Sequence, residues 1–145
     1  MLQEEQSLYI YNKVEQPRAT FPKRERMVSQ KLIDLLFLGG QSQSMGAFPL
    51  RAVCHVRPRT EEAEPLQLLI SVPKKRLKHA VDRNRVKRQV REAFRHNKLL
   101  LAQTLPADKA LLLAFVWQAD TLFSSHVVEA RVTKLLKRVA QQLES

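Results

Sequence analysis

Residues 77–91 have the sequence LKHAVDRNRVKRQVR, and this stretch, followed by EAFRHNKLL, carries the strongest structural signal in the chain. A helix over residues 80–99 advances 100° per residue, so a stripe of apolar side chains falls on one side. That stripe is expected to be buried, and it consists of Val86, Val90, Ala93 and Phe94. The adjoining arc carries one amide among cations: Arg83, Asn84, Lys87, Arg88, Arg91, Arg95 and Lys98.

The positive charge of the chain is concentrated around this helix. Residues 74–98 hold eleven lysines and arginines against two acids, which accounts for +9 of the net charge of +11. A one-sided charge run repels itself, so it favours a nucleic-acid partner over a merely solvated helix face. Guanidinium groups also bind phosphate in a bidentate geometry that lysine cannot match. Asn84 is interpreted either as a group that reads a base edge or a 2′-hydroxyl, or as an ordinary residue at a helix start.

Length and composition limit the class of protein. A chain of 145 residues with 44% hydrophobic and 27% charged residues suits one folded domain, and excludes a disordered polycation, a fibrous protein and a multidomain enzyme. The longest apolar run, Ala110–Trp117, is far shorter than the ~20 residues of a membrane span. With no secretory apolar stretch at the amino terminus and a single cysteine, the chain is expected to be cytoplasmic, with no membrane association and no disulfide.

The remaining segments predict an α+β sandwich, in which helices pack on one sheet. Residues 1–20 are expected to be a flexible N-terminal extension, and residues 21–145 the folded domain. The expected order is a helix from Ser29 to Gly39, two or three strands, the basic helix, a strand and a last helix. The strands are placed at residues 48–56 and 66–72, paired as a hairpin, and at residues 110–118, whose apolar side chains on both faces indicate a central position. Ser124 or Ser125 is expected to cap the last helix.

The first helix has two apolar stripes. Leu32, Leu35 and Leu36 share the face expected to contact the core, while Ile33 and Phe37 form a second stripe. The second stripe is interpreted either as part of a broad core face or as the apolar lining of a cleft.

Residues for catalysis by the protein alone are not expected. A metal-dependent nuclease needs converging carboxylates, whereas the acids here lie in a turn, in the N-terminal extension or singly on helices. The four histidines lack metal-ligand spacing, and three glycines leave no phosphate-binding loop. The sequence therefore predicts no catalytic residue, no metal ligand and no cofactor bound by the protein itself.

The basic helix and its approach resemble the signature of the bacterial ribonuclease P protein subunit family. The matching features are Lys74-Lys75 at the end of a strand, Arg83-Asn84-Arg85, Lys87-Arg88, and Arg91-Glu92-Ala93-Phe94-Arg95. The resemblance extends over about residues 22–140. The chain departs from the family pattern at Ile33 and Arg51, where aromatic residues are usual, and between residues 75 and 80, where a glycine is missing.

The resemblance implies a ribosomal-protein-like αβ sandwich with a mixed sheet and a left-handed βαβ crossover through the basic helix. It also implies a protein that binds a catalytic RNA and the 5′ leader of precursor tRNA, and that assists the RNA in removing the leader with Mg²⁺. No obligate protein partner is implied. The expected RNA-binding residues are Lys74, Lys75, Arg83, Asn84, Arg85, Lys87, Arg88, Arg91 and Arg95. The expected leader cleft consists of Ile33, Phe37, Phe48 and Arg51.

Two other functions are considered beside this one. The first is a non-catalytic RNA-binding protein of ribosomal type, and the second is a DNA-binding helix protein or a nuclease in its own right. An apolar and aromatic cleft favours single-stranded RNA over duplex DNA, because unstacked bases need flat apolar surfaces.

Overall fold

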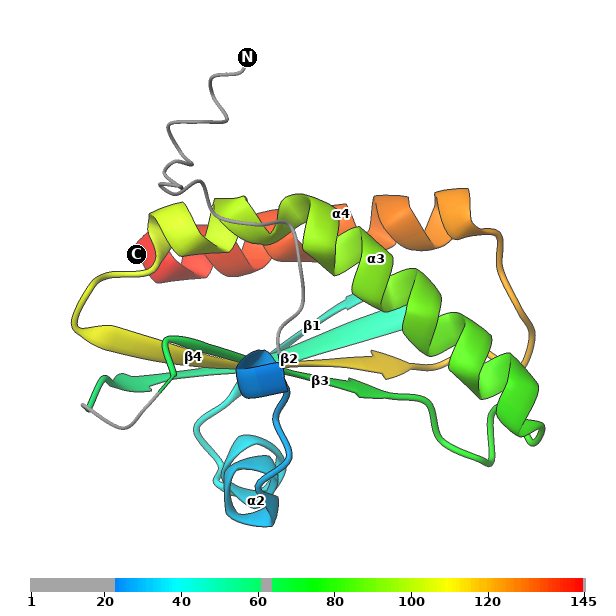
Figure 1. Ribbon diagram of the computed structural model, residues 1–145, viewed down its shortest axis with the longest axis horizontal. Helices are drawn as coiled ribbons and strands as arrows, with labels where there is room; N and C mark the ends of the chain where they lie inside the picture. Colours follow the sequence, from blue (N-terminus) through cyan, green and yellow to red (C-terminus); the bar gives the residue numbers. More distant parts are fainter. Residues whose placement is uncertain (1–22, 61–63, 145) are drawn as a thin grey trace.

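The computed structural model describes residues 23–60 and 64–144, so the expected extension at residues 1–20 lies outside the described part. The elements follow one another in this order: η1 (Lys23–Glu25), α2 (Gln30–Leu38), β1 (Gln43–Ala47), β2 (Leu50–Pro58), β3 (Leu66–Ser71), α3 (Ala80–Thr104), β4 (Lys109–Trp117) and α4 (Ser125–Glu144). Helices α3 and α4 cover one face of the sheet and α2 lies on the other (Figure 1). The expected α+β sandwich with one mixed sheet is confirmed.

Two apolar clusters hold these layers together. The larger cluster lies between the sheet and the α3/α4 pair, and it includes Val86, Val90, Phe94, Phe115 and Trp117. The smaller one lies between the sheet and α2 and is formed by Met27, Leu36, Val53, Leu112 and Ala114. Strand β4 supplies both clusters because its side chains are buried on both faces, as the apolar sequence of residues 110–118 predicted.

The strand order, β1-β2-β4-β3, corrects the expected hairpin between residues 48–56 and 66–72. Strand β2 pairs antiparallel with both β1 and β4, whereas β3 pairs only with β4 and runs parallel to it. The physical reason is the apolarity of β4, which is buried best in the centre of the sheet, between β2 and β3. The hairpin partner of β2 is β1, whose polar sequence QSMGA gives a weak strand signal.

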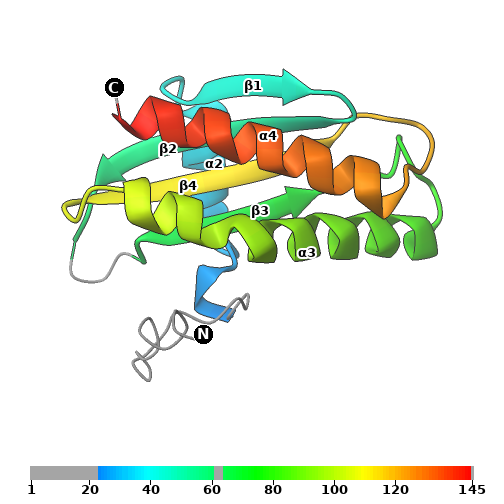
Figure 2. The same cartoon turned by 90° about the horizontal axis from the view of Figure 1, so that it is seen from above.

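The connection from β3 through α3 to β4 is a parallel crossover. Figure 2 views the sheet from the helix side, where the chain passes from β3 over the sheet to β4 in the left-handed sense. Right-handed crossovers are the rule in ~98% of such units. The left-handed crossover that the family resemblance implied is therefore present, and it places α3 along β3 at the edge of the sheet.

The helix boundaries agree with the sequence signals at most ends. Ser29 caps α2, its side chain accepting from the Leu32 N–H, and Gly39 follows the last turn. The Ser124 hydroxyl accepts from the Val127 N–H, so Ser124 caps α4. Helix α3 continues to Thr104, five residues beyond the expected end. No helix of the described residues is long and apolar enough to cross a membrane.

Candidate nucleic-acid interface

The basic side of α3 faces outward because its apolar stripe is fully buried. Val86, Val90, Ala93 and Phe94 each have 0% of their surface exposed, as the 3.6-residue period predicted. The helix is therefore fixed in rotation about its own axis. The expected RNA-binding residues consequently lie on the surface or at its edge, and none of them is used to fill the core.

The approach to α3 is braced by one of its own arginines. The Arg83 Nη1 donates to the carbonyl oxygens of Leu77 and Lys78, both at 2.9 Å. No side chain caps the helix at His79, so this arginine orders the turn that leads into the helix. Lys74 and Lys75 lie exposed in the preceding turn. Arg83 thus has a structural role in addition to its positive charge.

The central part of α3 presents cations that the rest of the protein does not neutralise. Within the described chain, these side chains make no hydrogen bond or ion pair: Asn84, Arg85, Lys87, Arg88 and Arg91. Asn84, Arg85 and Arg88 are exposed, while Lys87 and Arg91 are half-buried toward β3. We name these five residues the α3 ridge. Their donors are available to an external acceptor such as phosphate.

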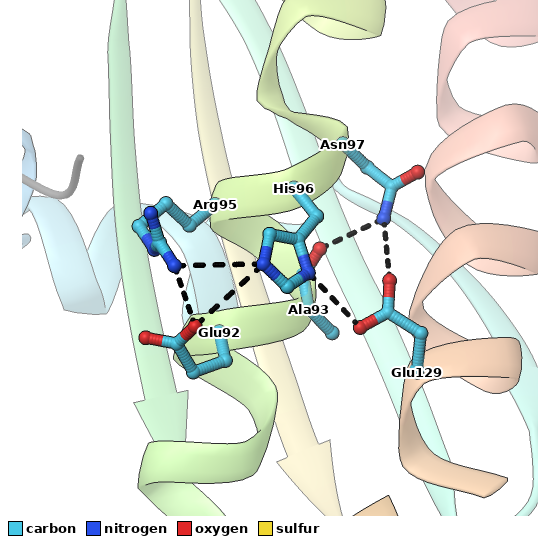
Figure 3. Close-up of polar contacts among 6 residues, drawn as sticks. All are labelled: Glu92, Ala93, Arg95, His96, Asn97 and Glu129. Atoms are coloured by element: carbon cyan, nitrogen blue, oxygen red, sulfur yellow. Dashed lines mark hydrogen bonds and ion pairs between the residues drawn. The ribbon is translucent and has the colours of Figure 1, made fainter. Parts of the chain in front are cut away.

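The ridge ends at a network of charged and polar groups between α3 and α4 (Figure 3). Arg95 donates to Glu92 at 2.7 Å, and His96 lies between Glu92 and Glu129, with nitrogen–oxygen distances of 3.7 and 3.4 Å. The Asn97 amide donates to the Ala93 carbonyl oxygen and to Glu129. Arg95 is therefore already paired, unlike the members of the ridge.

The ion pair between Arg95 and Glu92 is formed by two charged groups at neutral pH. The hydrogen bond from Arg95 lowers the pKa of the Glu92 carboxyl, and the same bond raises the pKa of the Arg95 guanidinium. A lowered carboxyl pKa means that the pair is lost only as the pH falls through that lowered pKa. Further along the helix Lys98 pairs with Glu25 at 2.9 Å, with both side chains largely buried.

The face of the sheet beneath α2 gathers three of the four expected cleft residues. Ile33 packs against the smaller apolar cluster, and Phe37 is 37% exposed at the side of the same helix. Arg51 donates to the Ser44 hydroxyl at 2.8 Å on the neighbouring strand. Next to Arg51 in the register stands Gly46, where a side chain would meet open space. We name this surface, formed by α2 and by β1 and β2 around Arg51, the α2 face.

Phe48 lies away from the other three. Its ring packs edge-on against Phe123 at 6.0 Å between centroids, and Phe123 packs in the same way against Trp117 at 5.7 Å. Trp117 belongs to the cluster under α3 and α4, so this aromatic chain is anchored on the opposite side of the sheet. Phe48 belongs to the turn before β2. It lies on the same side of the sheet as Leu50 and Ala52, which belong to this cluster, and therefore on the side opposite Arg51.

Groups for metal binding or covalent chemistry do not converge in the described part of the chain. No three His, Cys, Asp or Glu side chains of residues 23–60 and 64–144 are placed to hold a metal ion. Cys54 is buried, and burial raises the pKa of its thiol, which disfavours the reactive thiolate. The interface therefore offers positive charge, hydrogen-bond donors and apolar surface.

Sequence reasoning missed one cation that lies beside the α3 ridge, Arg26. It precedes α2 and lies next to Lys87 and Arg91 across the edge of β3. Its neighbours in sequence, Arg24 and Glu25, mix both signs of charge, so the local pattern did not single it out. Only the isolated bridge between Arg26 and Leu68 brings it beside the ridge.

Comparisons of the sequence with known proteins agree on one family. A family model described as ribonuclease P matches residues 21–140. A protein of Porphyromonas gingivalis named "Ribonuclease P protein component" is 38% identical over 130 residues, covering 88% of this chain and 93% of its own length. One of the same name from Chlorobaculum tepidum is 33% identical over 127 residues, with 81% of each chain covered.

Solved structures agree at the level of the fold. The RNase P protein of Staphylococcus aureus superposes with a TM-score of 0.60 at 20% identity, covering 79% of this chain and 94% of that one. The RNase P protein of Thermotoga maritima gives 0.56 at 23% identity, covering 76% and 94%. At these identities the likeness concerns the architecture.

We expect Glu92→Gln to raise the affinity for single-stranded RNA about two- to fivefold at ~50 mM salt, because it removes a negative charge and releases Arg95. Fluorescence anisotropy over a range of salt concentrations measures this, and the salt dependence should become steeper as one more cation contacts phosphate.

Glu144→Gln, at the far end of α4, is the matched control, since it makes the same charge change at an exposed site. An equal gain in both variants would attribute the effect to net charge alone. No gain in Glu92→Gln would contradict the assignment of Glu92 as the group that holds Arg95.

Proposed function

The chain belongs to the ribonuclease P protein family, and from this we propose that it works as the protein subunit of that ribonucleoprotein by binding two RNAs on two surfaces. The α3 ridge binds the catalytic RNA. The α2 face binds the 5′ leader of precursor tRNA. The protein thereby assists the endonucleolytic removal of the leader, which gives the mature 5′ end.

The observation that supports RNA binding most directly is the set of unpaired donors on the α3 ridge. Two exposed arginines, Arg85 and Arg88, and two half-buried cations, Lys87 and Arg91, have no carboxylate partner among the described residues. Concentrated charge of one sign carries a cost in self-repulsion that phosphate contacts offset. Contact with about six phosphates would reduce affinity roughly a thousandfold between ~50 and ~200 mM salt.

The α2 face has the properties that a single-stranded leader requires. Phe37 offers an aromatic ring at the surface, Ile33 gives apolar contact beside it, and Arg51 supplies a cation on the sheet. Unpaired bases stack on such rings, whereas a duplex keeps its bases covered. A leader bound here adds affinity for the precursor that the mature tRNA lacks.

We place the hydrolytic chemistry on the catalytic RNA, together with the Mg²⁺ ions that it uses. The protein surfaces described above provide positioning groups, and the carboxylates beside the ridge, Glu92 and Glu129, are engaged by Arg95, His96 and Asn97. Charge neutralisation by the ridge allows the RNA to fold and to bind its metal ions with less phosphate repulsion. Such a subunit acts in the cytoplasm, where precursor tRNA is made.

A general RNA-binding role of ribosomal type is not favoured, because the relatives that cover most of the chain are named ribonuclease P protein components. A DNA-binding helix protein is disfavoured by the α2 face, which suits single strands.

Reconstitution tests whether the catalytic centre lies in the RNA and not in the protein. We expect the purified protein alone to leave precursor tRNA intact, and the protein with the cognate catalytic RNA to remove the leader at a low Mg²⁺ concentration at which the RNA alone is slow. Gel analysis of the 5′ product measures this. Cleavage by the protein without the RNA would contradict the proposal.

Phe37→Ala tests the α2 face. We expect binding of leader-bearing precursor to weaken by about 1–3 kcal/mol, the range for loss of one stacked base, with little effect on mature tRNA. Leu38→Ala is the control, because Leu38 is adjacent on α2 but 79% exposed and packs in neither apolar cluster. Equal losses of affinity for precursor and mature tRNA in Phe37→Ala would contradict leader binding at the α2 face.

A further inference from the structure

A cavity of about 270 Å³ lies at the free edge of the sheet, beside β3. Its walls come from three separate segments: Arg26 and Met27 before α2, residues 68–70 of β3, and Lys87 and Arg91 of α3. Figure 2 shows why these segments meet, since α3 runs along β3 at the edge of the sheet and η1 approaches the same strand. The cavity is distinct from the α2 face and reaches only one side of the α3 ridge.

The charge in this cavity is entirely positive. Three cations and no acid line it, and within the described chain neither Lys87 nor Arg91 makes an ion pair. Both are half-buried, so their charges are less screened than those of fully exposed side chains. The arrangement is electrostatically complementary to a single anionic group held between α3 and the segment before α2.

The backbone of β3 adds a hydrogen-bond donor. The Met27 N–H donates to the Leu68 carbonyl oxygen at 2.9 Å, which shows that the polar groups of Leu68 point to the free edge. Alternate residues of a strand point the same way, so the N–H of Ile70 faces the same edge. Beyond the bridge to Leu68, no backbone group of the described chain pairs with Ile70 at this edge, and an unpaired edge N–H is ready to bind an acceptor.

The floor of the cavity contains residues of both apolar clusters. Met27 and Leu69 pack in the cluster beneath α2, whereas Ile70 packs in the cluster beneath α3 and α4. The cavity thus lies where the α2 side of the sheet ends and the α3 side begins. An RNA strand that runs around the edge of β3, from the α2 side of the sheet to the ridge, would pass over it.

We propose that this cavity binds one phosphate of the precursor's 5′ leader, with Arg26, Lys87 and Arg91 as its cationic partners and the Ile70 N–H as a donor. The inference rests on the proposed function, since it extends the path of the leader from the α2 face across the edge of β3. Arg26 is the new binding residue, and it works with two members of the α3 ridge.

The size and shape of the site favour a single strand. The volume is close to the lower limit of ~300–1,000 Å³ for small-ligand pockets, so it accommodates about one nucleotide. The apolar floor of Met27 and Ile70 suits a ribose or an unstacked base, which a duplex does not expose in this way. Because Met27 and Leu69 pack on the α2 side of the sheet, where we place the leader, the bound strand is the leader and not the catalytic RNA.

The test combines a protein variant with changes in single phosphates of the leader. Precursor tRNAs carry one neutral methylphosphonate at successive leader positions, and their affinities for the holoenzyme are measured with wild-type protein and with Arg26→Gln. We expect Arg26→Gln to weaken precursor binding about three- to tenfold. At one leader position, the methylphosphonate should weaken precursor binding by a similar factor with the wild-type protein and by almost nothing with Arg26→Gln. Such non-additivity is the signature of a direct contact between Arg26 and that phosphate.

Arg24→Gln is the matched control, because Arg24 is exposed, pairs with Glu64 at 3.6 Å and does not line the cavity. The loss of affinity caused by Arg24→Gln should be additive with the loss caused by a methylphosphonate at each leader position, because Arg24 contacts none of these phosphates. The bridge to Leu68 uses the backbone of Arg26, so Arg26→Gln leaves the fold intact, as circular dichroism and thermal melting will verify.

Three results would overturn the inference: additive losses with Arg26→Gln at every leader position, equal weakening of mature tRNA, or coupling only to phosphates of the catalytic RNA. A different result would contradict the proposed function itself. If the protein does not bind the leader at all, the wild-type holoenzyme would bind precursor no more tightly than mature tRNA.

Discussion

The burial of one stripe of α3 is the constraint on which the rest of the structure depends. Val86, Val90 and Phe94 are completely enclosed between the sheet and α4, and this fixes which side of a strongly basic helix meets solvent. Burying a Val or a Phe contributes about 1.5–3 kcal/mol each, so the orientation is held far more firmly than any single surface ion pair could hold it. The unpaired cations of the ridge are thus supported by an apolar anchor.

The central strand β4 extends this arrangement to both sides of the sheet. Its two buried faces separate the α2 face from the α3 ridge, so one small domain holds the two surfaces that we propose for RNA binding in a fixed relation. The left-handed crossover keeps α3 beside the edge strand β3. That edge is where Arg26, Lys87 and Arg91 line one cavity beside the ridge.

The sequence predicted what depends on local periodicity and left open what depends on long-range pairing. The stripe of α3, the cap at Ser29 and the buried β4 follow from patterns within single segments. The pairing of β3 with β4 and the strand β1 depend on partners distant in the chain, so the local patterns did not predict them. The same holds for two electrostatic features, the restraint of Arg95 by Glu92 and the approach of Arg26. Phe48 was grouped with the cleft by the family resemblance, whereas its ring packs on the opposite side of the sheet.

The central claim is that α3 faces the catalytic RNA while the α2 face holds the leader, and tethered hydroxyl-radical probing tests it most directly. The native Cys54 is buried, so an iron chelate attaches selectively to a cysteine placed at Asn84 or at Leu38. In the assembled holoenzyme with precursor tRNA, the probe at residue 84 should cleave the catalytic RNA and the probe at residue 38 the leader. Cleavage of the same RNA from both positions, or the reverse pattern, would contradict the account.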